Sequence, residues 1–187
     1  VVSVDSPGLV SEYSGARYSL ETASPVTPTG TPTTLNFSLT TGGGISGTTS
    51  PGGVTVAYCL VGSFYLCDST VSDQSGNYAF SRLTPGSYQV SFSSGGYVTQ
   101  FYNGAAEAAL STPVTVAAGA TTSGIDATMV PGGEIHGTVR DGSSNPIAGA
   151  TVTAVAADSA VVSTVTGDDG SYVLAGLGNG AVWLSAS

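Results

Sequence analysis

Alternation of apolar and polar residues along this chain predicts β-strands rather than helices. In the stretches 54–60, 78–80, 88–92, 114–116 and 125–129 every second residue is apolar, as expected of strands that bury one face. Turn sequences rich in Gly, Asp, Asn and Pro separate these stretches, and no segment keeps a helical period. The pattern predicts an all-β protein made of tandem β-sandwich modules of about seven strands each.

The sequence repeats itself with a period of about ninety residues, a normal size for one small β-sandwich. The matching segments are 13–16 with 102–105, 24–27 with 112–115, 45–48 with 135–138, 52–58 with 149–155, and 72–93 with 167–187. Residues 1–10 also resemble 89–98, so the repeat starts and stops inside a module. We therefore expect the back half of a module at 1–43, a complete module at 44–131, and the front half of another at 132–187.

Half a sandwich exposes an inner apolar face and unpaired strand edges, which favours pairing with another segment. Residues 1–43 lead without a linker into the first strand of the complete module, and 132–187 follow its last strand. The two ends of a sandwich in a tandem array usually lie at opposite poles. We therefore expect the front half of one copy to accept the back half of the next, head to tail, by donor-strand complementation. A window of a longer tandem array, or an arbitrary cut through one, stays open as an alternative.

In this hypothesis the partners are copies of the same chain or adjacent repeats of it. The predicted donor positions are apolar residues of the first part: Val2, Val4, Leu9, Val10, Leu35, Phe37 and Leu39. The predicted acceptor positions are in the last part: Ile135, Val139, Val152, Tyr172, Leu174, Leu177 and Trp183.

The stretch from Gly132 to Ser187 resembles the carboxypeptidase regulatory-like module, also described as transthyretin-like or prealbumin-like. The residues that carry the resemblance are Gly137-Thr138-Val139, Pro146, Gly149-Ala150-Thr151-Val152, Asp169-Gly170-Ser171-Tyr172, Leu177 and Gly180, with a second set from Gly47 to Tyr88. The resemblance implies a seven-stranded, Ig-like Greek-key sandwich, repeated on a secreted bacterial surface protein. It further implies an accessory role without catalysis.

Composition narrows the range of partners. Lys and Arg total 3 against 12 Asp and Glu, and the net charge is −9, so a basic surface for nucleic acid or for a membrane is excluded. No apolar run approaches the length of a transmembrane helix. The chain begins at Val1 rather than Met, so we expect a processed product or a fragment.

Cys59 and Cys67 flank a short turn centred near Ser63, which would place them opposite each other on paired strands. That arrangement favours a cross-strand disulfide over two free thiols or a metal site. A disulfide indicates an oxidising compartment, so we expect a secreted, extracellular or cell-surface protein.

Other candidate chemistry is sparse. His136, the single histidine, has only Glu134 nearby in the sequence, which favours an exposed strand histidine over a zinc ligand or a catalytic base. Asp73, Asp168 and Asp169 are interpreted as turn caps rather than calcium ligands. No cofactor is expected. The absence of lysine excludes the Lys–Asn isopeptide bond of collagen-adhesin B-type domains, which some related surface modules form.

Sugar chemistry gives three weaker candidates. Asn36-Phe37-Ser38 is a formal N-glycosylation acceptor, and the Thr/Pro run 27–34 could carry O-glycans. Tyr13, Phe101 and Tyr102 beside an Asn-Gly turn could form a platform for surface glycans.

These observations favour a non-enzymatic extracellular structural protein, a subunit or repeat of a surface filament or array. An accessory or adhesive repeat of a larger secreted enzyme or adhesin is the second hypothesis. A carbohydrate-binding module is the third.

Overall fold

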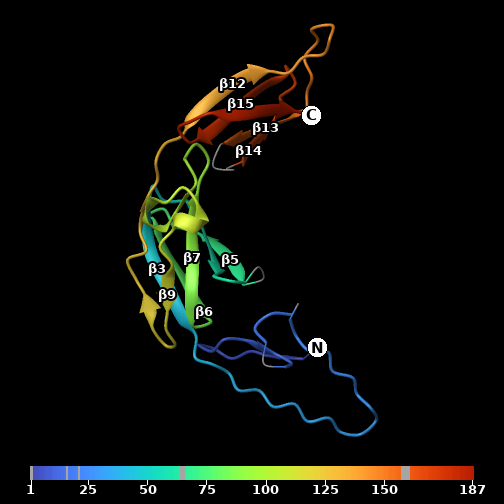
Figure 1. The fold of residues 1–187 in the computed structure, drawn as a ribbon, viewed down its shortest axis with the longest axis vertical. Helices are drawn as coiled ribbons and strands as arrows, with labels where there is room; N and C mark the ends of the chain where they lie inside the picture. The colour runs from blue at the N-terminus through green and yellow to red at the C-terminus, as the bar shows by residue number, and fades with distance from the viewer. Residues whose placement is uncertain (1, 16, 21, 64–65, 157–160) are drawn as a thin grey trace. The chain divides into compact units, whose positions relative to one another are not determined.

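The computed structural model describes residues 2–15, 17–20, 22–63, 66–156 and 161–187. Strands make up nearly all of the regular structure in these residues (Figure 1), which confirms the all-β prediction. The described helical elements are two short 3₁₀ turns, η1 (Tyr102–Gly104) and η2 (Ala108–Leu110). The chain divides into two compact units, residues 1–92 with 101–128 and residues 93–100 with 129–187. The finer division at 43 and 131 stays a prediction.

The first unit contains a two-sheet sandwich. In one sheet, β3 (Gly43–Ser50) pairs antiparallel with β6 (Asn77–Leu83) and parallel with the short strands β10 (Thr121–Thr122) and β11 (Ala127–Thr128). The other sheet has the order β5 (Cys67–Val71), β4 (Thr55–Leu60), β7 (Gly86–Ser93) and β8 (Gln100–Phe101), and β9 (Val114–Val116) also pairs with β7.

The core of this sandwich follows the alternation of the sequence. Tyr88, Val90 and Phe92 of β7 are all at most 2% exposed, and the residues between them are not buried. Three more core residues come from late in the module: Val114, Val116 and Ile125. The late strands therefore supply part of the core as well as the edges of the sheets.

The second unit repeats the front of this sandwich. One sheet pairs β12 (Gly133–Thr138) with β15 (Ser171–Leu177), and the other has the order β14 (Val161–Val165), β13 (Thr151–Ala156) and β16 (Val182–Ala186). These five strands correspond to β3 to β7, and the register agrees, because Gly47 lies opposite Tyr78 as Gly137 lies opposite Tyr172.

The structure corrects one detail of the repeat alignment. Matching 52–58 with 149–155 pairs Gly52 with Gly149, but the structural equivalent of Gly149 is Gly53. Both Gly53 and Gly149 have positive φ, and each donates its N–H to the carbonyl that ends the next strand, Ser72 or Thr166. Glycine adopts this conformation without steric cost, so the turn fixes the register.

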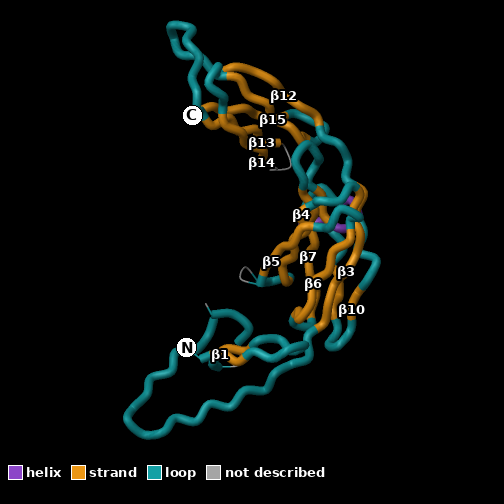
Figure 2. Tube along the Cα trace, turned by 180° about the vertical axis from the view of Figure 1, so that it is seen from behind, coloured by secondary structure: helices purple, strands orange, loops and turns teal. Residues whose placement is uncertain are grey.

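The beginning of the chain carries little regular structure. β1 (Ser3–Val4) pairs with β2 (Glu12–Tyr13), and residues 22–40 contain no strand (Figure 2). Most side chains from 22 to 36 are exposed. This stretch aligns with the residues that form β9, β10 and β11 in the complete module. Its sequence therefore resembles that of edge strands, although it pairs with no sheet here.

Candidate assembly site

A late segment of the first unit closes the free edge of β3. The N–H of Ile125 donates to the carbonyl of Ser46 over 3.2 Å, and the Tyr78 hydroxyl donates to the carbonyl of Ile125 over 2.5 Å. A Cβ at Gly47 would overlap this same Ile125 carbonyl, so only glycine permits the approach. Gly47 therefore leaves room for the backbone of Ile125, and the Tyr78 hydroxyl holds it there by a hydrogen bond.

Two further contacts hold the same segment. The carboxylate of Asp126 accepts hydrogen bonds from the N–H of Thr48 over 2.7 Å and from its hydroxyl over 2.9 Å. A Cβ at Gly43 would overlap Val116 and the carbonyl of Ala117. The glycines at both positions of β3 therefore let a later backbone approach this strand very closely.

The second unit has the same residues at the equivalent positions, but no described residue pairs with the other edge of its strand. Among the described residues β12 pairs only with β15. The nearest atom to a Cβ built on Gly133 lies 3.7 Å away, and the atoms nearest to a Cβ built on Gly137 belong to the Tyr172 side chain, with its hydroxyl at 2.5 Å. Within the described part of the chain the Tyr172 hydroxyl has no hydrogen-bond partner. Two close-approach glycines and a tyrosine thus stand beside an open strand edge.

A sequence equivalent to the segment that covers β3 is present at the start of the chain. Residues 31–39 align without a gap with 121–129, so Leu35 takes the place of Ile125 and Asn36 the place of Asp126. Leu35 is 39% exposed and Asn36 is exposed. The amide oxygen of Asn36 can accept from Thr138 as Asp126 accepts from Thr48.

The structure separates the predicted donor residues into two groups. Val2 and Leu35 are exposed, and Val4, Phe37 and Leu39 are partly exposed. Leu9 and Val10 are already engaged in their own unit: Val10 is 6% exposed and donates its N–H to Thr40, and Leu9 bridges to Thr41. The side chain of Val10 is therefore buried, whereas that of Leu9 stays partly exposed although its backbone is paired.

Most of the predicted acceptor residues form one cluster. Its buried members are Val152, Ala154, Leu174 and Leu177, with Ile135, Val139, Val162, Tyr172 and Val182 packed against them. Trp183 lies outside the cluster. It is 63% exposed and pairs with Val155 on the outer face of its sheet, opposite to the core.

One connection occurs in both units. In the first, the carbonyl of Gly8 accepts from Gly42 and that of Thr40 from Val10; in the second, Gly96 accepts from Gly132 and Val130 from Val98. Each loop contacts a residue with positive φ. In the first unit this residue is Arg82, which donates to the carbonyl of Leu9 and forms an ion pair with Asp5. Its counterpart in the second unit is Gly176. The loop that precedes a module thus docks on the module in the same way twice.

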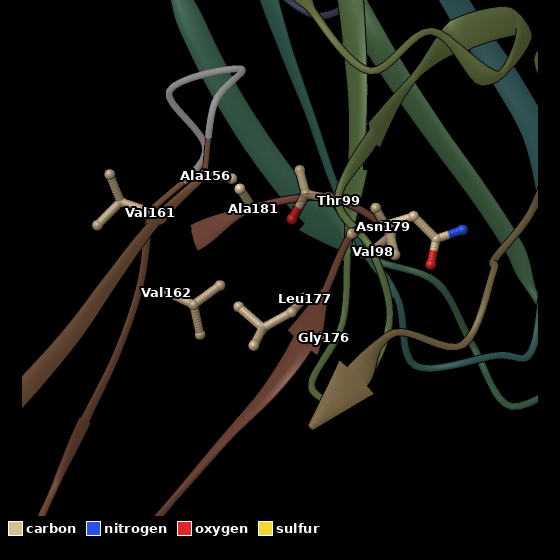
Figure 3. Close-up of a pocket in the computed structure, with 11 residues that line it drawn as sticks. Val98, Thr99, Ala156, Val161, Val162, Gly176, Leu177, Asn179 and Ala181 are labelled. Carbon is tan, nitrogen blue, oxygen red and sulfur yellow. The ribbon is translucent and has the colours of Figure 1, made fainter. Parts of the chain in front are cut away.

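A cavity of about 280 Å³ lies beside this connection in the second unit (Figure 3). Val162 and Leu177 face it, and Gly178, Gly180 and Ala181 complete one wall. The corresponding cavity of the first unit, about 290 Å³, is lined by tyrosines instead: Tyr13, Tyr18, Tyr58 and Tyr88. The two are equivalent positions of the repeat. Tyr13 lines the cavity of the first unit, and Phe101 and Tyr102 are not among its lining residues. The predicted sugar platform stays a prediction.

The predicted disulfide is present. Cys59 and Cys67 lie opposite each other on β4 and β5 and are bonded. The second unit has Val155 and Val161 at the same two positions. The covalent link therefore belongs to the complete module only.

The remaining polar candidates take local roles. The His136 ring lies 3.0 Å from the Glu134 carboxylate on exposed β12, and no group of three or more metal-ligating side chains occurs among the described residues. Asp73 accepts from the N–H of Asn77, which holds the pKa of its carboxyl below its ordinary value. Asp169 accepts from Ser171 in the same kind of turn. In the described residues no helix is long and apolar enough to span a bilayer.

Sequence reasoning named apolar acceptor positions, which stay a prediction, and did not single out Gly133, Gly137 or the Tyr172 hydroxyl. The signal was available in the repeat, since the same two glycines and the same tyrosine recur at 43, 47 and 78. The sequence does not show why glycine stands at positions 43 and 47. The reason is the close approach of Ala117 to Gly43 and of Ile125 to Gly47 in the folded module.

The architecture is that of tandem β-sandwich repeats. The model of the carboxypeptidase regulatory-like domain matches residues 49–130 and again 134–187, and the chain belongs to this family. No curated protein matches the chain. One similar solved structure is that of the Bacillus anthracis TIE protein, with 16% identity and a TM-score of 0.36 over 71% of this chain. The chain spans 25% of that structure's length.

Proposed function

We propose that this protein is a non-enzymatic structural repeat of the cell surface or extracellular space that assembles head to tail. In this proposal, residues 24–40 of one copy complete the sandwich that residues 132–187 of another leave open. Each copy carries one donor segment and one acceptor, so the contact is heterologous and propagates into a filament unless it closes into a ring.

The observation that carries the proposal is the contrast between two equivalent strand edges. A Cβ at Gly43 or Gly47 on β3 would overlap later residues of the same module, whereas a Cβ at Gly133 on β12 would meet only the Leu177 carbonyl, at an ordinary contact distance of 3.7 Å. An open edge with a matching strand elsewhere in the same chain is the situation that β-augmentation resolves.

The proposed extracellular location has separate support. A disulfide such as Cys59–Cys67 persists in oxidising compartments, and only 8% of the residues of the chain are charged.

The experiment compares the 187-residue chain with Gly133→Val. A valine side chain has room in the isolated second unit but would occupy the path of the incoming backbone. We expect the wild-type chain to sediment, with rising concentration, well above its monomer mass of 18.3 kDa and to form filaments or rings in electron micrographs. The variant should remain monomeric with an unchanged circular dichroism spectrum.

The matched control is Gly142→Val, at an exposed turn glycine of the same unit with no atom within 4 Å of a built Cβ. It should assemble like the wild type. A wild-type chain that stays monomeric at all concentrations, or a Gly133→Val variant that assembles as well as Gly142→Val, would overturn the proposal.

A further inference from the structure

The single tryptophan of the protein lies on an exposed apolar strip. Trp183 on β16 pairs with Val155 on β13, which in turn pairs with Val161 on β14. All three side chains point to the outer face, and they are 63%, 38% and 62% exposed. Exposed aromatic residues backed by other apolar groups are typical of protein contacts.

The complete module shows what covers this position. The residue equivalent to Trp183 is Gln89 on β7, and its side-chain amide donates to the carbonyl of Ala108 over 2.7 Å. Ala108 begins η2, in the segment that leads from β8 towards β9. In a finished module, therefore, the segment before the completing strands crosses the outer face at this point.

The equivalent crossing segment at the start of the chain is more apolar than that of the complete module. Residues 13–20 align without a gap with 102–109, so Tyr18 stands in place of Glu107 and Leu20 in place of Ala109. Tyr18 is 39% exposed and Leu20 is 57% exposed. Apolar residues have thus replaced polar or small ones on both sides of the contact, with Trp183 in place of Gln89.

We propose that Tyr18 and Leu20 of one copy cover Trp183 of a second copy. The inference rests on the proposed head-to-tail assembly and adds a second contact to it, on the outer face of the sandwich instead of its open strand edge. Within one module the chain connection holds the crossing segment in place, so a polar contact such as that of Gln89 suffices. Between two chains that each carry a net charge of −9, an apolar contact supplies the affinity that connectivity would otherwise provide.

The experiment uses the tryptophan itself as the probe. Because the chain has one tryptophan, its fluorescence reports on Trp183 alone. On assembly, followed in parallel by sedimentation, we expect the emission to move to shorter wavelength and quenching by acrylamide to fall severalfold.

Variants test the contact from both sides. Trp183→Gln restores the residue of the complete module and should weaken assembly about tenfold or more, since buried tryptophans dominate interfaces. Leu20→Ala should weaken it by a smaller factor and leave the Trp183 emission of the assembled form closer to that of the monomer. The control is Leu110→Ala, which removes a leucine that is 73% exposed elsewhere and should change neither readout.

The outcomes separate the two proposals. Assembly with an unchanged Trp183 emission, or an undiminished assembly of Trp183→Gln, overturns the outer-face contact and leaves strand completion standing. No assembly at any concentration overturns both.

Discussion

The hydroxyl of Tyr78 reaches across Gly47 and donates to the backbone carbonyl of Ile125, 47 residues further along the chain. This bond joins the front of the sandwich to the strand that completes it. Tyr172 and Gly137 repeat the first two partners, and Leu35 repeats the third in sequence but lies elsewhere in the chain. Each of the three residues that meet in the first unit therefore has a counterpart in the proposed contact between copies.

Removal of the two tyrosine hydroxyls should have different consequences. Tyr78→Phe leaves the buried Ile125 carbonyl without this donor and should lower the free energy of unfolding of the first unit by about 1 kcal/mol. Tyr172→Phe should leave the stability of the monomer unchanged and weaken assembly about fivefold, because its acceptor is supplied only by a partner. Urea denaturation and sedimentation measure the two effects. Equal loss of monomer stability in both variants would contradict the assignment.

Reduction of the disulfide should affect one module only. The Cys59–Cys67 bond closes a short loop, so its loss should lower the free energy of unfolding of the first unit by about 2.5 kcal/mol on the chain-entropy model. The second unit has valines at both positions and should be unaffected. Amide hydrogen exchange with and without dithiothreitol reports on each unit separately. The Cys59→Ala/Cys67→Ala variant should reproduce the reduced state and show no further response to the reductant.

Buried phenols should make the first unit sensitive to alkali. Burial raises the pKa of Tyr88 to about 12 and raises that of Tyr78 still further above the ordinary value. Between the unfolded pKa of about 10 and the higher folded pKa, the folded state holds more protons than the unfolded state, so stability falls as pH rises. Thermal unfolding at pH 9, 10 and 11 should show a falling midpoint. Tyr88→Phe should show a shallower decline, and a steady midpoint over this range would contradict the assignment.

Salt should strengthen the proposed assembly. Each copy carries a net charge of −9, so approach of two copies is opposed by a repulsion that ions screen. The residues proposed to meet, Leu35, Tyr172 and Trp183 among them, are uncharged and form no ion pair that salt would weaken. Sedimentation between 0.01 and 0.3 M sodium chloride should show a larger assembled fraction at the higher concentration. A fraction that falls with salt would point to ion pairs at the contact instead.

Much of the fold could be predicted from the sequence because it depends on local patterns. Alternation at 54–60 and 88–92 gives strands with one buried face, whatever lies on the other side of the core. The short loop between Cys59 and Cys67 brings the two sulfurs together without help from distant residues. The repeat of about ninety residues also predicts which segments share a fold, and the family match confirms it.

The sequence was less informative about faces and contacts. Trp183 was predicted among the acceptor residues because it is large and apolar, but its strand turns it to the outer face beside Val155. Val10 was predicted among the donor positions, but its side chain is only 6% exposed within its own unit. In both cases the residue type was apparent and its direction was not, because direction depends on register and on what packs nearby.

By itself the sequence determined the strands, the turns, the disulfide and the period of the repeat, all of which rest on residues close together along the chain. Only the tertiary structure decided why Gly43 and Gly47 are glycines, and which strand edge of the second unit has no partner among the described residues. Those facts depend on the approach of backbones that are far apart in sequence, and a distance of that kind is fixed by the packing of the whole sandwich.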